Sequence, residues 1–148
     1  MPIRVLLDTS ILMISLELPF DLFGEIEKLL KANIEFLILQ EVQEELQRLS
    51  QKKTPTGVRA SHALEVAAKH KTLQIGSTSD TRTDDALIIA SREVKAIVAT
   101  ADSQLRRRLR TLKVPVLSLR GNRLYCEPDI AEYWPLRSQK TPFSRKDI

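Results

Sequence analysis

The sequence predicts an α/β protein, a three-layer α/β/α sandwich built around a central, mainly parallel sheet. The first observation behind this prediction is that short apolar stretches of strand length alternate with longer segments whose apolar residues recur at helical spacing. The second is size, because 148 residues that are 43% hydrophobic suffice for one compact domain with a core. Alternating strands and helices favour parallel strand pairs with helices on both faces of the sheet.

The first half of the chain is predicted to hold two strands and three helices. Residues 3–8 and 34–39 are apolar runs of strand length. Apolar residues at helical spacing predict helices over 21–32 and 40–52. A further helix is expected over 54–70, since a proline is tolerated in the first helical turn.

The second half is predicted to repeat this alternation and to end in a hairpin. Its expected elements, in order, are a polar loop over 75–83, a helix begun by Asp84 and Asp85, a strand over 96–100, a helix with a Leu105, Leu109 and Leu112 stripe, a strand over 114–119, a tight turn at Gly121-Asn122 and a short last strand. We therefore expect one domain over 1–126, followed by a basic, partly irregular tail over 127–148.

Composition excludes several classes of function. No apolar stretch approaches the roughly 20 residues of a membrane span, and the start of the chain does not resemble a signal peptide, so a cytoplasmic protein is expected. Cys126 has no second cysteine with which to pair, and His62 and His70 complete no zinc-binding spacing. Both histidines are predicted to lie on the surface.

Charge is distributed unevenly along the chain. Of the 23 Lys and Arg residues, 12 lie in 1–100 and 11 in 101–148, whereas of the 19 Asp and Glu residues, 14 lie in 1–100 and 5 in 101–148. The last third is therefore basic, as expected of a surface that binds phosphate groups. A solvated helix face is the alternative explanation for any single basic run.

Acidic residues occur where the predicted fold would bring them to one edge of the sheet. Asp8 closes the first strand and Asp102 follows another, and ligands of open α/β sheets bind outside the carboxyl ends of the strands. Asp84 and Asp85 begin a helix after a loop that is expected to cross the same edge, and Glu45 lies beside the apolar stripe of its helix. Four separate segments could thus direct carboxylates at one point.

All of these acids except Asp8 have a simpler explanation when taken alone. Asp84, Asp85 and Asp102 could cap their helices, and Glu45 could be a solvated helix residue, whereas Asp8 has no obvious structural task. Clustered carboxylates repel one another unless a cation neutralises them, and hard oxygen ligands suit Mg2+ or Mn2+. Such a site is suited to the attack of a metal-activated water on a phosphodiester.

Four acidic motifs resemble those of PIN-domain nucleases, in the same order and with similar spacing from Ile3 to about Cys126: "LLDTS", "EVQEEL", "TDDALIIAS" and "VATAD". The resemblance implies a PIN-like fold. It implies catalytic acids that bind Mg2+ or Mn2+ at Asp8, Glu45, Asp85 and Asp102. Asp84 would support them, and the choice between Asp84 and Asp85 as direct ligand stays open, with Asp85 favoured. The resemblance also implies supporting hydroxyl groups at Thr9, Ser10 and Thr100.

Within that family, the segment "DDALIIASREVKAIVATADSQLRRRLRTLKVPVLSLRGNR" is most similar to the branch that cleaves precursor ribosomal RNA of the small subunit. This implies a metal-dependent endoribonuclease in rRNA maturation and ribosome biogenesis, with ribosome assembly proteins as partners and a homodimer as a plausible assembly. RNA would be bound by the basic helix and hairpin, at Arg106, Arg107, Arg108, Arg110, Lys113, Arg120 and Arg123.

Two other functions remain open from the sequence. A VapC-type toxin would have the same fold and chemistry but would cut tRNA or rRNA to stop translation. A non-catalytic RNA-binding ribosome assembly factor would keep the fold without cleavage, although the presence of every acid argues against it. Phosphatases of the aspartyl-phosphate type fit less well, because Ser10 stands where they need a second acid.

Overall fold

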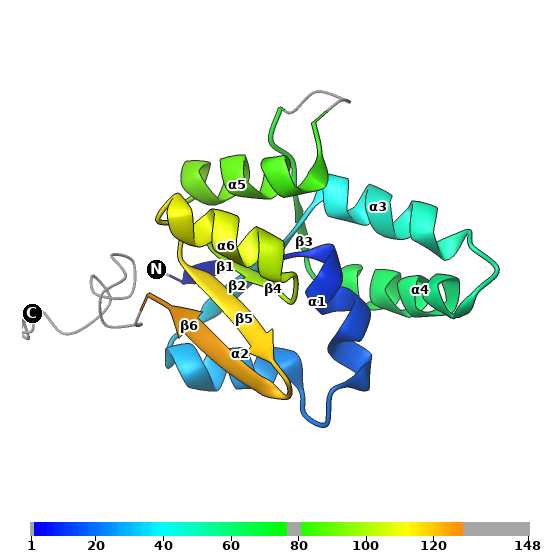
Figure 1. Ribbon diagram of the computed structural model, residues 1–148, viewed down its shortest axis with the longest axis horizontal. Coiled ribbons are helices and arrows are strands. Elements are labelled where there is room, and N and C mark those ends of the chain that lie inside the picture. Colours follow the sequence, from blue (N-terminus) through cyan, green and yellow to red (C-terminus); the bar gives the residue numbers. More distant parts are fainter. Residues whose placement is uncertain (1, 77–80, 129–148) are drawn as a thin grey trace, which may run out of the picture.

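A computed structural model describes residues 2–76 and 81–128 and contains one six-stranded sheet with the order β3-β2-β1-β4-β5-β6 (Figure 1). The strands are β1 (Ile3–Leu7), β2 (Ile34–Leu39), β3 (Lys71–Leu73), β4 (Ile97–Thr100), β5 (Val116–Arg120) and β6 (Arg123–Glu127). All neighbouring strands are parallel except β6, which pairs antiparallel with β5. The predicted α/β class and the mainly parallel sheet are confirmed.

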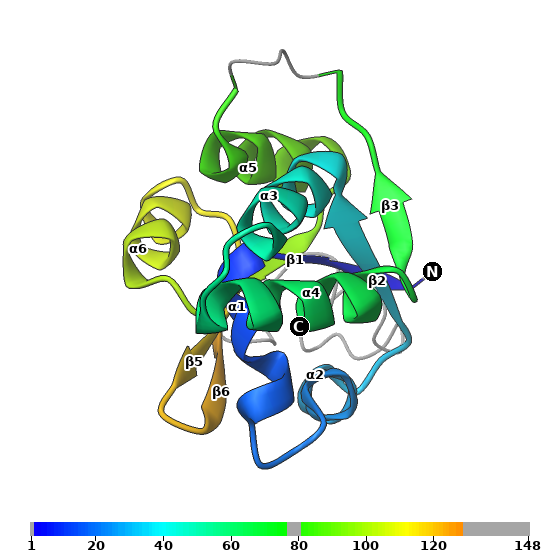
Figure 2. The same cartoon turned by 90° about the vertical axis from the view of Figure 1, so that its right-hand side faces the viewer.

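Helices cover both faces of this sheet. They are α1 (Thr9–Ile14), the 3-10 helix η1 (Ser15–Glu17), α2 (Leu22–Leu30), α3 (Gln40–Ser50), α4 (Pro55–Ala67), α5 (Thr83–Glu93) and α6 (Ser103–Thr111). In Figures 1 and 2, α5 and α6 lie on one side of the strands and α2 on the other. Helices α3 and α4 pack against each other. None of the described helices is long and apolar enough to cross a membrane.

The two central strands explain why the sheet forms as it does. Val5, Leu6 and Leu7 of β1 are fully buried, as is β4 from Ile97 onward, because parallel strands covered on both faces need unbroken apolar sequence. The register pairs Leu7 with Ala99. The residues that directly follow these two positions, Asp8 and Thr100, therefore emerge side by side at one edge of the sheet.

Three elements are not predicted by the sequence pattern: α1, the 3-10 helix η1 and β3. Helix α1 begins one residue after the end of β1, and its six residues are too few to show a helical repeat of apolar positions. Strand β3 has only three residues and is mostly exposed, so it carries no alternating pattern, and its pairing with β2 defines it. The predicted turn at Gly121-Asn122 is confirmed, and the positive φ of 62° at Gly121 suits glycine. Residues 77–80 of the predicted loop and 129–148 of the predicted tail lie outside the described residues.

The prediction that both histidines lie on the surface is wrong for His70. Helix α4 ends at Ala67, and the His70 ring beyond it is half-buried, stacked on Phe23 with 4.6 Å between ring centroids and edge-on to Phe36 at 5.6 Å. Burial lowers the pKa of His70, and the charge of Lys69 adds to this effect. His62 is exposed, as predicted.

The contribution of His70 to stability should be lost as the pH falls below about 6.5, the ordinary pKa of histidine. Because the pKa of His70 is lowered in the folded state, the unfolded state takes up its proton first, so this contribution to stability is present above about pH 6.5 and is lost as the pH falls toward the folded-state pKa. Melting temperatures between about pH 5.5 and 7.5 measure the effect. His70→Phe should flatten the profile, and His62→Gln should leave it unchanged; identical profiles for all three proteins would contradict the assignment.

Candidate active site

Asp8 occupies a buried position at the carboxyl edge of the sheet, with only 4% of its surface exposed. Its Oδ2 accepts hydrogen bonds of 2.7 Å from the hydroxyl groups of Ser10 and Thr100. Its Oδ1 accepts a 2.8 Å bond from the backbone N–H of Thr9, the first residue of α1. Asp8 thus has a structural task that the sequence does not reveal, since it caps this short helix.

The electrostatic environment of Asp8 opposes its ionisation. Burial raises the pKa of Asp8, the hydrogen bonds from Ser10, Thr100 and Thr9 work in the other direction, and the negative charge of Asp84 raises it again. The net direction is upward. Among the described residues, no Lys or Arg forms an ion pair with Asp8. A buried carboxylate without a basic partner is a position that a bound cation would stabilise.

Two hydroxyl groups connect the ends of β1 and β4. The Ser10 hydroxyl lies 3.1 Å from that of Thr100 and accepts a 2.9 Å bond from the backbone N–H of Ala101. The Thr100 hydroxyl accepts a 3.0 Å bond from the backbone N–H of Asp102. These bonds fix the carboxylate of Asp8 and the backbone of Asp102 relative to each other. The predicted supporting residues Ser10 and Thr100 therefore contact the site.

Glu45 is joined to the same region through Thr9. The Thr9 hydroxyl donates a 2.6 Å hydrogen bond to Oε1 of Glu45, and this bond connects α1 to α3. Glu45 is half-buried, so it is not a fully solvated helix residue. The third predicted supporting hydroxyl thus holds a second acid rather than Asp8.

Asp84 and Asp85 both lie in the first turn of α5 but have different surroundings. Burial raises the pKa of Asp84, as do the negative charges of Asp102 and Glu45. Asp85 instead accepts a 2.7 Å hydrogen bond from Arg108 of α6. Adjacent helical residues point about 100° apart, and Asp84 is the one of the two whose charge acts on Asp8 and is acted on by Asp102 and Glu45. Which acid would hold a metal stays a prediction, and the arrangement favours Asp84, whereas the sequence favours Asp85.

Asp102 combines a capping function with proximity to the other acids. Its Oδ1 accepts bonds of 2.8 and 3.3 Å from the backbone N–H groups of Gln104 and Leu105, so it caps α6. Within the described ranges its other carboxylate oxygen accepts no hydrogen bond. The helix thus holds Oδ1 of Asp102, and the other oxygen is left to bind a ligand.

The donor chemistry of these acids fits a hard divalent cation. The charge of Asp84 is coupled to those of Asp8, Glu45 and Asp102, and all four offer carboxylate oxygens. The side chains do not form a closed ligand set: across 2–76 and 81–128, no three Asp, Glu, His or Cys side chains lie close enough together to hold a metal ion. Like charges favour separation, which a divalent cation would offset.

The seven basic residues predicted to bind RNA divide into two groups. Arg106 and Arg120 each form a 2.9 Å ion pair with Glu127, and Arg108 pairs with Asp85. The other four, all exposed, have no ion-pair partner within the described part of the chain: Arg107, Arg110, Lys113 and Arg123. The sequence does not single out Glu127, although it is the one acid in the basic hairpin. It also misses Arg82, whose charge lowers the pKa of Asp84 against the effects of burial and the neighbouring acids.

Comparisons with solved structures agree with this fold. A structure described as the PIN domain endonuclease Utp24 matches 85% of this chain and 92% of its own, with a TM-score of 0.71 and 27% sequence identity. A domain of a functionally unknown protein from Methanocaldococcus jannaschii matches 80% of this chain and 91% of its own, with a TM-score of 0.61 and 16% identity. The second likeness concerns the fold alone.

Comparisons of sequence identify the family. No curated protein matches the chain significantly. The model of a family described as a PIN-like domain matches residues 5–122. This range begins within β1, contains Asp8 and every helix, and ends at the turn between β5 and β6. The match thus covers most of the chain and all the acids of the site. On this evidence the chain belongs to the PIN-like domain family.

Proposed function

We propose that this protein is a Mg2+- or Mn2+-dependent endoribonuclease that hydrolyses RNA phosphodiester bonds. The observation that carries the proposal is the buried carboxylate of Asp8, held by three hydrogen bonds, with no ion-pair partner among the described residues and next to the charge of Asp84. The similarity to the endonuclease Utp24, which has the same fold over most of both chains, supports hydrolysis of a phosphodiester as the reaction.

The proposed role of each residue follows from its contacts. Asp8, Asp84, Asp102 and Glu45 would hold the ion, and Asp85 would not. When bound, the ion would lower the pKa of a water molecule and neutralise the leaving oxygen. Ser10 and Thr100 fix the Asp8 carboxylate, and Thr9 fixes Glu45. These hydroxyl groups would keep the acids oriented, which reduces the reorganisation that catalysis requires.

RNA is the proposed substrate because basic residues lie next to the acids. Asp102 caps the start of helix α6, which carries exposed arginines. The chain has few aromatic residues, 5% in total, which favours recognition of the RNA backbone and shape over stacking on bases. Precursor rRNA of the small subunit is the favoured RNA, because the segment over 84–123 resembles the PIN-domain branch that cleaves it. The proposal includes a cytoplasmic location, ribosome assembly proteins as partners and a homodimer as the assembly.

Removal of divalent metal should abolish cleavage. The purified protein, incubated with precursor rRNA and Mn2+, should cut the RNA internally, and EDTA should stop the reaction because the acids alone cannot activate water. Added Mn2+ should restore it. Gel analysis of end-labelled RNA provides the measurement.

A parallel incubation with tRNA distinguishes the proposed rRNA-processing nuclease from the VapC-type toxin. Cleavage of tRNA in preference to precursor rRNA would favour the VapC-type toxin. The absence of cleavage of either RNA in Mn2+, together with measurable RNA binding, would reject the nuclease and favour the non-catalytic assembly factor.

A further inference from the structure

The arginines of α6 and the hairpin are not equally available to a ligand. Glu127 of β6 binds Arg106 with one carboxylate oxygen and Arg120 with the other, each at 2.9 Å. The Arg120 guanidinium also lies 4.8 Å from the centroid of the Tyr125 ring. Burial acts to raise the pKa of Glu127, but the hydrogen bond and charge of Arg106 and the charge of Arg120 hold it below its ordinary value. The ion pair of Arg106 thus fastens the hairpin to α6, and the ion pair of Arg120 joins the two strands of the hairpin.

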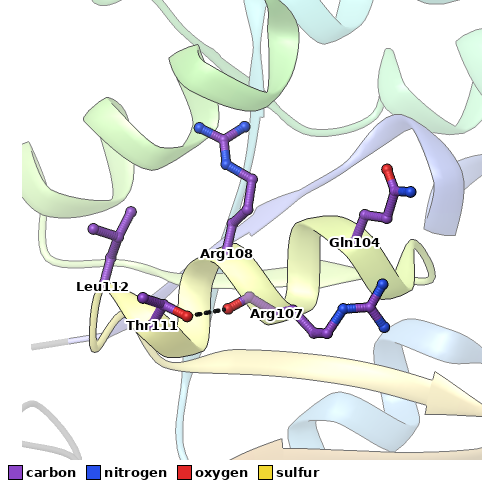
Figure 3. Close-up of a pocket in the computed structure, with 5 residues that line it drawn as sticks. All are labelled: Gln104, Arg107, Arg108, Thr111 and Leu112. Atoms are coloured by element: carbon purple, nitrogen blue, oxygen red, sulfur yellow. Dashed lines mark hydrogen bonds between the residues drawn. The ribbon is translucent and has the colours of Figure 1, made fainter.

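A hollow of about 480 Å3 lies on the surface of α6, and its lining includes neither Glu127 nor the two arginines that pair with it. It is lined by Gln104, Arg107, Arg108, Thr111 and Leu112 (Figure 3). Every lining residue is exposed, and the lining includes two guanidinium groups, a side-chain amide and a hydroxyl, with no acidic or aromatic side chain. Arginine is well suited to phosphate because its planar fork of N–H donors matches the phosphate oxygens. The chemistry of the lining therefore suits a phosphate group rather than a base.

Arg108 connects this hollow to the acids. In Figure 3 its side chain extends from α6 toward α5, where it forms the 2.7 Å ion pair with Asp85. Its charge also lowers the pKa of Asp84, against burial and the charge of Asp102, which raise it. Both members of this ion pair are about half exposed, at 49% and 43%, so the pair is weak and can exchange partners with a phosphate.

The distance along α6 fits the path of a nucleic acid strand. Arg107 and Arg108 follow the capping residue Asp102 by about one and a half helical turns, which corresponds to about 8 Å along the helix axis. A strand whose cleaved bond lies at the acids can therefore reach the hollow with a neighbouring phosphate.

We infer that the α6 hollow is a binding subsite for one backbone phosphate of single-stranded RNA next to the cleaved bond, with Arg107 and Arg108 as its ligands. Asp85 is then a positioning residue, which holds the Arg108 side chain at the rim of the hollow. Arg106 and Arg120 are structural. The inference rests on the proposed function for the identity of the strand, but the binding it describes does not require cleavage.

Binding of a short fluorescently labelled single-stranded RNA, measured by anisotropy in EDTA, tests the subsite. Arg107→Gln and Arg108→Gln should each raise the Kd by about fivefold to tenfold, because each removes a charged hydrogen bond to phosphate. Each should also reduce the slope of log Kd against log salt concentration by about one.

Arg110→Gln is the matched comparison: the sequence predicts that Arg110 also binds RNA, but this residue lies on the same helix outside the hollow, so the subsite requires a smaller loss of affinity there. It should change the Kd by less than about twofold. Equal losses for Arg110→Gln and Arg107→Gln would show diffuse attraction to the helix and would overturn the subsite, as would unchanged affinity of the Arg107 and Arg108 variants. Circular dichroism of each variant verifies that the fold is intact.

The experiments can reject the proposed subsite and the proposed nuclease activity separately. Loss of affinity in the Arg107 and Arg108 variants, with no cleavage by the unaltered protein in Mn2+, would support the subsite and reject the nuclease. Cleavage by the unaltered protein, with unchanged affinity in both variants, would reject the subsite alone.

Discussion

Asp8→Asn is expected to abolish RNA cleavage, lowering the rate by about a thousandfold or more, while RNA affinity stays the same. Asparagine has the shape of aspartate, and its carbonyl oxygen can still accept the bond from the backbone N–H of Thr9. The side-chain amide can donate to the hydroxyl groups of Ser10 and Thr100, which accept as well as donate. Only the negative charge that would hold the cation is lost.

The same substitution should not lower the melting temperature. Because the pKa of Asp8 is raised in the folded state, the folded state binds this proton more readily than the unfolded state, so stability from this group falls as the pH rises above 3.8 toward the folded-state pKa. At neutral pH a neutral asparagine removes that cost. A variant that loses both cleavage and thermal stability would mean that Asp8 acts mainly as the cap of α1.

Asp21→Asn provides the control for this experiment. Asp21 also caps a helix, since its Oδ2 accepts a 3.3 Å bond from the backbone N–H of Gly24 at the start of α2, but it is exposed and takes no part in the site. Asparagine is as good a cap as aspartate. Cleavage by Asp21→Asn should equal that of the unaltered protein. Cleavage by Asp8→Asn at a comparable rate would reject Asp8 as a metal ligand.

Asp84→Asn and Asp85→Asn should differ strongly, although the two residues are neighbours in the sequence. Asp84 is coupled to Asp8, Glu45 and Asp102, so its neutralisation should lower kcat by about a hundredfold or more. Asp85 faces Arg108, so its neutralisation frees an arginine and should change mainly KM, by a few-fold. Steady-state kinetics on one RNA in Mn2+ separates kcat from KM.

Each variant of this pair is the control for the other, because both remove one charge from the first turn of α5. Equal losses of kcat in the two variants would indicate that negative charge in the first turn of α5 matters, and not which of the two side chains faces the other acids. A larger loss of kcat in Asp85→Asn would reverse the assignment and restore the choice that the sequence favours.

Much of the fold could be predicted because the central strands are determined by burial. Strands that are covered on both faces need apolar runs, and residues 5–7 of β1, 36–39 of β2 and 97–99 of β4 form such runs. Acids that directly follow such strands must emerge at the carboxyl edge, so the sequence alone marks Asp8 and Asp102 as candidates. The extents of α3 and α6 follow in the same way from the spacing of their buried residues.

The directions of individual side chains, and the residues that they contact, could not be predicted. Whether Asp84 or Asp85 faces the acids depends on the rotation of α5 about its axis, which its contacts with the rest of the protein fix and its own sequence does not. The half-buried position of His70 depends on aromatic rings contributed by α2 and β2. Neither the rotation of α5 nor the aromatic contacts of His70 produce a periodic pattern in the sequence.

By itself, the sequence determined the alternation of strands and helices, the central strands and the acids at their ends, because burial and strand direction act on contiguous residues. Only the tertiary structure decided that Ser10 and Thr100 hold Asp8, that Asp85 pairs with Arg108 and that Glu127 pairs with Arg106 and Arg120. The reason is physical: a hydrogen bond or an ion pair depends on distances of a few ångströms between segments that meet only after the chain has folded.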